Sequence, residues 1–285
     1  MPRCFSRSRS VGANMSELLS IINDQVNQTK LVVIFALIMA RVMAIVVLVP
    51  FMGGKNAPPE VKMGIGATLT IILWPTVTAN MPEGLPITPG IFIFMMLKET
   101  FVGIVIGFIA AEIFYTVEMA GQLIDLYRGA NQAQLMVPQI TERSSAFGSL
   151  GYQLILALFV ALNFHHIFIE SLFESFVAIP INRFPDLTGG LYPLTEAVMR
   201  TGGDIVLVAV LLSMPVAILA LIIEVSFGLI NRVAPQINAY FMAMPGKVMA
   251  GCIVFLAAVS MTIESYIHHS HEMLNRLDKI LILFQ

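Results

Sequence analysis

Charged side chains and cysteine are scarce in this chain of 285 residues. Only 12% of the residues are Asp, Glu, Lys or Arg, whereas 57% are hydrophobic. A water-soluble domain carries about 25% charged residues, so the composition excludes most soluble enzymes. We therefore expect the chain to be surrounded by lipid or by other apolar protein surfaces.

The lack of excess basic charge, of paired cysteines and of enzyme motifs excludes further functional classes. The formal net charge of −2 offers no basic face for nucleic acid. Cys4 and Cys252 lie in a tail and in an apolar segment, so they predict neither a disulfide framework nor a metal site. The sequence also lacks the serine-hydrolase, phosphate-loop and dinucleotide motifs. We expect no enzyme and no cofactor.

A cluster of histidines near the C-terminus is the nearest approach to a metal site. His268, His269, His271 and Glu272 have spacings that put two ligands on one helical face. No motif of a metal enzyme surrounds them, so we expect no bound metal.

Six long apolar stretches make up most of the chain. A helix that crosses a bilayer needs about 20 mostly apolar residues. Ser144–Ile169 and Ile205–Ile223 contain no charge and qualify, whereas Val248–Ile263 is marginal. The sequence therefore predicts an all-α, polytopic membrane-associated protein built from helical hairpins. The stretches are Leu31–Phe51, Met63–Ala79, Ile91–Val117, Ser149–Val177, Ile205–Ile230 and Val248–Ile263.

Proline, glycine and polar residues predict the connections and the ends of the domain. Long polar connections are expected at Gly121–Gly148, Pro180–Gly203 and Asn231–Lys247. Residues 1–14 are expected to be a disordered basic tail or a misassigned start, with Met15 as the initiator in the second case. Residues 15–264 are expected to form a single helical domain. Residues 265–285 are predicted to be an amphipathic helix that docks on a partner or lies on a membrane surface.

Several ionisable residues lie within the apolar stretches, where a charge is expensive unless it is paired or hydrated. We expect ion pairs between neighbouring helices, with a hydrated or proton-coupled path as the alternative. Lys98 and Glu99 are adjacent, so their side chains point about 100° apart on a helix. They are not expected to neutralise each other, and each needs a partner elsewhere. These residues are Arg41, Lys98, Glu99, Glu112 and Glu224.

Two other local patterns give specific expectations. Asp125 and Arg128 are three residues apart, a spacing that predicts a salt bridge on one helical turn near a helix end. His165 and His166 lie in an apolar helix and are expected to be hydrogen-bonded interior groups rather than a proton relay.

The sequences of the polar connections resemble those of a known family. Residues 121–130 read GQLIDLYRGA and residues 231–241 read NRVAPQINAYF, while Lys98-Glu99 precedes Gly103 and Gly107. These separated motifs, together with Arg41 and the Pro50-Phe51 pair, are similar to the FliR/SctT family of type III secretion export-gate subunits. The resemblance extends from about residue 30 to residue 263. The Ile-Asp-x-x-Arg-Gly motif that contains Asp125 resembles the injectisome branch of the family more than the flagellar branch.

The resemblance implies a non-enzymatic export gate in the bacterial inner membrane. The subunit would assemble with R-type (FliP-like) and S-type (FliQ-like) subunits around a channel for unfolded secreted proteins. A U-type (FlhB-like) switch protein would clasp the assembly. No nucleic acid and no cofactor are implied.

The resemblance also implies two functional segments. The loop Ala130–Thr141 would be the plug of the channel. The alternative is that this segment is an ordinary surface loop. The turn after residue 234 would face the channel or the switch protein, and the alternative is a tight interhelical turn. Plug residues are Arg128, Gly129, Asn131, Gln134, Leu135, Met136, Val137 and Pro138. Turn residues are Pro235, Gln236, Asn238, Phe241 and Lys247, and buried-charge or assembly residues are Arg41, Lys98, Glu99, Asp125 and Glu224.

A function of a different class remains open at this point. A stand-alone secondary transporter for small solutes also uses broken helices and charges at membrane depth. Pro215 and Glu224 in the fifth apolar stretch fit that alternative, but the long polar connections do not.

Overall fold

Every regular element that the computed structural model describes is a helix. The described residues are 29–54, 57–79, 89–129, 145–184, 192–236 and 239–283. They form an N-terminal helix (Thr29–Leu48), α2 (Pro50–Gly53), α3 (Pro59–Ala79), α4 (Pro89–Tyr127), α6 (Ala146–Ala161), α7 (Phe164–Ala178), α8 (Tyr192–Val233) and α9 (Ala239–Leu283).

Five of these helices are long and apolar enough to cross a membrane, and the bent pair of α6 and α7 makes a sixth if it counts as one span. The prediction of an all-α polytopic membrane protein is confirmed. Prolines begin α2, α3 and α4, because the first helical position needs no backbone N–H donor.

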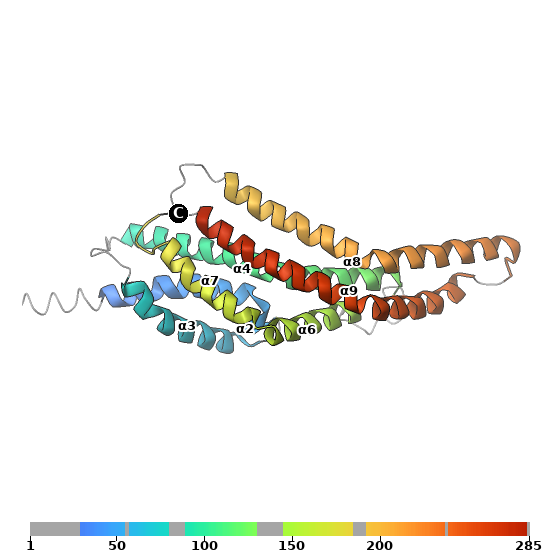
Figure 1. Cartoon of the computed structure of the whole chain (residues 1–285), viewed down its shortest axis with the longest axis horizontal. Coiled ribbons are helices and arrows are strands. Elements are labelled where there is room, and N and C mark those ends of the chain that lie inside the picture. The colour runs from blue at the N-terminus through green and yellow to red at the C-terminus, as the bar shows by residue number, and fades with distance from the viewer. Residues whose placement is uncertain are drawn as a thin grey trace, which may run out of the picture.

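The long helix α4 runs through the middle of the bundle and contacts α6, α8 and α9 (Figure 1). The N-terminal helix approaches it at Gly103 and Gly107. A Cβ atom at Gly103 would lie 2.5 Å from the carbonyl oxygen of Arg41, and one at Gly107 would lie 3.1 Å from Cβ of Leu48. Two glycines four residues apart let these helices pack backbone against backbone.

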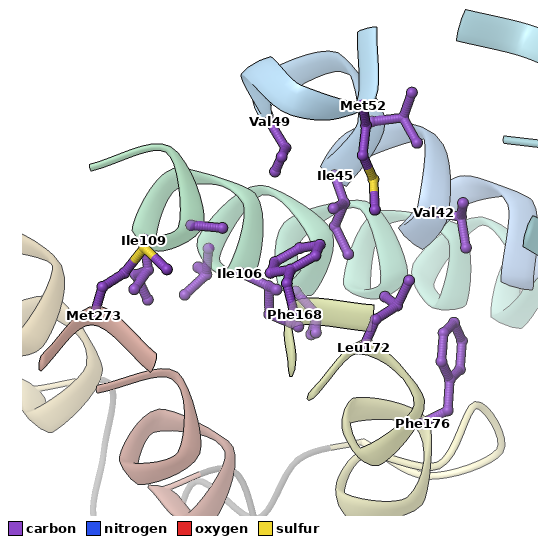
Figure 2. Packing of buried hydrophobic residues seen from close by; sticks show 14 of the residues in the cluster. Val42, Ile45, Val49, Met52, Ile106, Ile109, Phe168, Leu172, Phe176 and Met273 are labelled. Atoms are coloured by element: carbon purple, nitrogen blue, oxygen red, sulfur yellow. The ribbon is translucent and has the colours of Figure 1, made fainter. Parts of the chain in front are cut away.

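The core lies where the N-terminal helix, α4 and α7 meet. Figure 2 shows members of this cluster from all three helices: Val42 and Ile45 of the N-terminal helix, Ile106 of α4, and Phe168 and Leu172 of α7. These side chains are almost completely buried. This core is therefore formed within the single chain, and the outer faces of the bundle are available for contacts with lipid or other proteins.

One apolar stretch is broken where the sequence analysis expected an uninterrupted span. The stretch Ser144–Ile169 qualifies by length and composition, but α6 ends at Ala161 and α7 leaves it at 75°. Asn163 lies between them with a left-handed φ of 61°. Asparagine adopts this conformation more readily than other non-glycine residues, so the break falls at the residue that accommodates it best.

The helices extend into the segments that were predicted to be polar connections. α4 continues to Tyr127, α8 begins at Tyr192, and α9 begins at Ala239 and contains Pro245. α9 also runs without interruption through residues 265–283, the segment expected to be a separate amphipathic helix. Tyr266 and Met273 of this segment are 3% and 2% exposed and join the core.

The hairpin of α8 and α9 extends beyond the rest of the bundle (Figure 1). Its outer faces are apolar: six residues of this kind are between 55% and 72% exposed. Such a surface requires lipid or another protein around it. The residues are Leu221, Val225, Leu229, Met249, Ile253 and Leu256.

Candidate functional site

Three buried acidic side chains of α4 each connect this helix to different neighbours. Glu99 faces the N-terminal helix and α7, Glu112 faces α8 and α9, and Asp125 faces the start of α6. We call these the α7-cap cluster, the junction cluster and the loop-base cluster. Because carboxylates inside an apolar bundle need compensation, each cluster fixes the position of α4 against a neighbouring helix.

The α7-cap cluster is built around Arg41, which is 0% exposed. Its Nε donates to Glu99 Oε2 at 2.5 Å, and its two terminal nitrogens donate to the carbonyl oxygens of Ser175 and Ile179 at 2.8 and 2.9 Å. Its guanidinium also lies over the ring of Phe176, 4.2 Å from the centroid. The last carbonyl groups of a helix lack partners and attract cations, so Arg41 caps the C-terminus of α7.

Lys98 completes this cap. Its ammonium group donates to the carbonyl oxygens of Pro180, Ile181 and Arg183 at 3.0, 3.1 and 2.9 Å. It also lies 2.6 Å from Glu99 Oε1. The expectation that these neighbours do not pair is wrong, because the long lysine side chain spans the angle between adjacent positions. Each also has partners elsewhere, as expected.

The loop-base cluster joins the end of α4 to the start of α6. Arg128 Nη2 lies 2.6 Å from Asp125 Oδ1, so the predicted pair is confirmed. Asp125 Oδ2 accepts from Ser145 Oγ at 2.5 Å and from the backbone N–H of Phe147 at 3.2 Å. Ser145 is the N-cap of α6, and its Oγ accepts from the N–H of Gly148. A carboxylate is stabilised at this end of a helix by free N–H groups and the helix dipole.

This cluster brackets the segment that the resemblance identifies as a plug. Arg128 stacks over the ring of Phe147 at 4.4 Å, and Gly129 ends the helical region with a φ of 79°. Arg128, which precedes the segment, and Ser145, which follows it, are thereby held by one network. The other predicted plug residues lie outside the described residues: Asn131, Gln134, Leu135, Met136, Val137 and Pro138.

The turn between α8 and α9 holds the second predicted segment. Pro235 and Gln236 are exposed in this turn, and Phe241 at the start of α9 is 51% exposed. Asn238 lies outside the described residues. Lys247 does not lie in the turn, because α9 has already begun.

Lys247 instead forms an ion pair with Glu224 across the hairpin. The lysine side chain is 8% exposed, whereas the glutamate side chain is 58% exposed. The hairpin therefore carries a buried cation whose counter-ion lies on its apolar surface.

The junction cluster was missed by sequence reasoning, apart from Glu112. Arg276 of α9 lies 3.0 Å from Glu112 of α4 and 2.9 Å from Asp204 of α8. Tyr266 lines the same cavity as Glu112; its buried hydroxyl donates to the carbonyl oxygen of Ile155, and burial raises the pKa of this hydroxyl. The only signal in the sequence was that Arg276 lies on the polar face of a predicted amphipathic helix, which does not identify partners so distant along the chain.

The histidines do not form a site in the described part of the chain. His166 is exposed, and Nδ1 of the half-buried His165 has no hydrogen-bond partner among the described residues. The prediction that both are hydrogen-bonded interior groups is wrong for His166, because its side chain is exposed at the start of α7. His268 instead lies 3.5 Å from Glu272 on the surface of α9.

Comparison with known proteins identifies a family. The profile described as "Bacterial export proteins, family 1" matches residues 32–273. The Yop proteins translocation protein T of Yersinia pestis is 29% identical, over 87% of this chain and 93% of that protein. The flagellar biosynthetic protein FliR of Bacillus subtilis is 26% identical, over 79% and 86%. The secretion system apparatus protein SsaT of Salmonella typhimurium is 28% identical, over 62% and 67%.

Proposed function

The chain belongs to the bacterial export proteins of family 1, and from this membership we propose that it is the FliR/SctT-type subunit of an export gate. It is a multi-pass membrane component of a secretion export apparatus and not an enzyme. Its proposed role is to build, with R-type and S-type subunits, a channel for unfolded proteins in the bacterial inner membrane. A U-type switch protein is the proposed fourth partner.

The surface of the α8–α9 hairpin carries this proposal. Glu224 is 58% exposed among apolar side chains such as Leu221 and Val225, in a helix long enough to cross a membrane. Lys247 pairs with this carboxylate, but an ion pair whose acidic member is exposed to acyl chains is still expensive, whereas water in a channel or a polar group on a sister subunit stabilises it. The same position speaks against a chain that lies alone in lipid, as the transporter alternative requires.

The plug role of residues 130–141 is supported by chemistry at and around the segment. Leu135, Met136 and Val137 supply an apolar constriction of the kind that closes a pore by dewetting. The loop-base cluster ties both flanks of the segment to the bundle. A segment held in this way stays at one place in the channel while its middle is displaced.

The type of secretion system is proposed from one sequence motif. The Asp125-x-x-Arg128 pair favours an injectisome over a flagellum. The relatives include proteins named for both kinds of system at similar identity, so the proposal depends on this pair. Complementation of an injectisome mutant, with no rescue of a flagellar mutant, would support it.

Purification of the tagged chain from its native membranes tests the export-gate assignment. We expect a large complex that contains the R-type and S-type subunits. A monomer or dimer that takes up solutes in liposomes would instead support the transporter.

A second experiment tests the plug. Deletion of residues 134–137 should make membranes that carry the assembly leaky to ions. Replacement of Leu135, Met136 and Val137 by serine should do the same without shortening the loop. Deletion of residues 187–190 from another connection is the matched control and should leave conductance low. Unchanged conductance in the first two variants would refute the plug assignment.

A further inference from the structure

Among the described residues, the junction cluster joins three carboxylates to one cation, so it contains more negative charge than that cation neutralises. Arg276 lies 3.0 Å from Glu112, 2.9 Å from Asp204 and 4.0 Å from Glu272. Asp204 and Glu272 are 32% and 46% exposed, so water screens both carboxylates. Glu112 is only 8% exposed and depends on the protein for its stabilisation.

Half of the Glu112 carboxylate has no donor in the described part of the chain. Arg276 Nη1 donates to Oε1, but the buried Oε2 has no hydrogen-bond partner among the described residues. An ionised carboxylate with a buried, unpaired oxygen is unfavourable, and a proton on that oxygen removes the charge and supplies a donor.

Glu112 also lines a small cavity between α4, α8 and α9. The cavity has a volume of about 20 Å³, which is enough for one water molecule. Its polar lining comes from Thr116 on α4 and from Thr262, Ser265 and His269 on α9. A proton donor at Glu112 therefore has hydroxyl groups nearby, and a water molecule in the cavity would link it to them.

We propose that Glu112 is an exchangeable proton-binding site at the junction of α4, α8 and α9. A proton from solvent forms an O–H bond at Oε2 and returns to solvent when that bond breaks, with no other covalent change. Among the described residues, the titratable groups that face the site are Asp204 on α8 and Tyr266, His269, Glu272 and Arg276 on α9. Asp204 and Glu272 favour the bound proton, whereas Arg276 favours the ionised form, so the site is set between these opposing charges.

Proton binding changes how the helices are tied together. The ionised form holds α9 to α4 and α8 through Arg276, whereas the protonated form leaves the guanidinium paired chiefly with Asp204. Occupancy of the site thus alters the α4–α9 contact. This inference does not depend on the proposed channel, since the site lies within one chain.

Infrared difference spectroscopy of the full chain, purified with its co-purifying subunits, tests the site. At about pH 6 exposed carboxylates are ionised, so a carboxylic acid C=O band that disappears as the pH is raised to about 9 reports a buried, exchangeable proton. We expect the wild type to show such a band, sensitive to D2O, and Glu112→Gln to lose it. Glu196→Gln alters a glutamate that is 48% exposed on α8 and is the matched control. It should retain the band.

A conservative variant keeps the test decisive if Glu112→Gln does not fold. Glu112→Asp retains a carboxyl group and should shift the frequency of the same band without abolishing it. The proposal is refuted if the wild type has no pH-dependent band, if the band survives in Glu112→Gln, or if it is unaltered in Glu112→Asp.

Discussion

Arg41 and Glu99 form an ion pair with no exposed surface, with 2.5 Å between Nε and Oε2. The guanidinium also donates to two carbonyl oxygens at the end of α7. One arginine therefore connects the N-terminal helix, α4 and α7. The pair holds together elements that are far apart in the sequence, so its loss should affect the whole bundle.

Arg41→Leu should lower the free energy of unfolding by about 3–5 kcal/mol, because it leaves the carboxylate of Glu99 buried with fewer donors. Thermal unfolding in detergent and the yield of assembled complex measure the effect. Arg41→Lys keeps the charge but not the forked donors and should be intermediate. Arg200→Leu removes an arginine whose side chain is 74% exposed and should change little. Normal stability and normal assembly of Arg41→Leu would contradict the structural role.

Gly103→Ala should also destabilise the bundle, by about 1–3 kcal/mol. The new Cβ would lie 2.5 Å from the backbone oxygen of Arg41, and backbone cannot move aside as a flexible side chain does. Gly64→Ala is the matched control, since no atom lies within 4 Å of its added Cβ. It should be neutral or stabilising because alanine favours a helix. Equal melting temperatures for the two variants would mean that the N-terminal helix tolerates a wider separation from α4.

The fold class could be predicted from the sequence because hydrophobic length is a strong signal. Long apolar stretches leave few alternatives to membrane helices. The break at Asn163 could not be predicted in the same way, since one asparagine in an apolar run is compatible with a continuous helix. The helix ends near Tyr127 and Tyr192 were also missed, because they are stabilised by tertiary contacts that the local sequence does not reveal, those of Asp125 with the start of α6 and of Leu194 with the core.

The candidate site could be predicted only in part, and for a physical reason. A charge inside an apolar stretch is visible in sequence, so Arg41, Glu99 and Glu112 were identified. Their partners are not visible when they come from helix ends or exposed segments. The carbonyl oxygens that bind Lys98 have no side-chain signature, and Arg276 lies in a segment where charge is ordinary. The i, i+3 spacing of a local pair such as Asp125 and Arg128 is much easier to read.

Exchange of the two charges in the hairpin should be tolerated better than either single change. Glu224→Leu leaves the ammonium group of Lys247, which is 8% exposed, without its counter-ion, and should cost about 1–3 kcal/mol. The double variant Glu224→Lys with Lys247→Glu restores an ion pair and should recover much of the loss. Thermal unfolding of the wild type, Glu224→Lys, Lys247→Glu and the double variant gives the coupling energy.

The same variants separate pairing from partner binding. Glu224 is largely exposed, so a partner subunit that contacts it directly would still be lost after the charges are exchanged. Recovery of both stability and co-purification would assign the pair a role within the hairpin alone.

Ser145→Ala should weaken the loop-base cluster by removing the N-cap of α6. The hydroxyl donates to Asp125 at 2.5 Å and accepts from the N–H of Gly148 at 2.9 Å. Loss of a serine N-cap costs about 1 kcal/mol, and Asp125 retains Arg128 and the N–H of Phe147 as partners. We therefore expect a modest fall in melting temperature, measured against Ser149→Ala, which alters an exposed serine one turn later in α6.

Asp125→Asn should have the larger effect at this cluster, because it removes the negative charge that neutralises Arg128 and faces the N-terminus of α6. The side chain of Arg128 is 13% exposed, so its guanidinium would lose its ionic partner in a largely buried position. If the cluster also fixes the flanks of a channel plug, Asp125→Asn should raise the ion conductance of assembled membranes as well as lower stability. A variant that loses stability but remains impermeable would confine Asp125 to the packing of α4 against α6. A variant that leaks at unchanged stability would mean that its main role is to hold the segment between Gly129 and Ser145 in place.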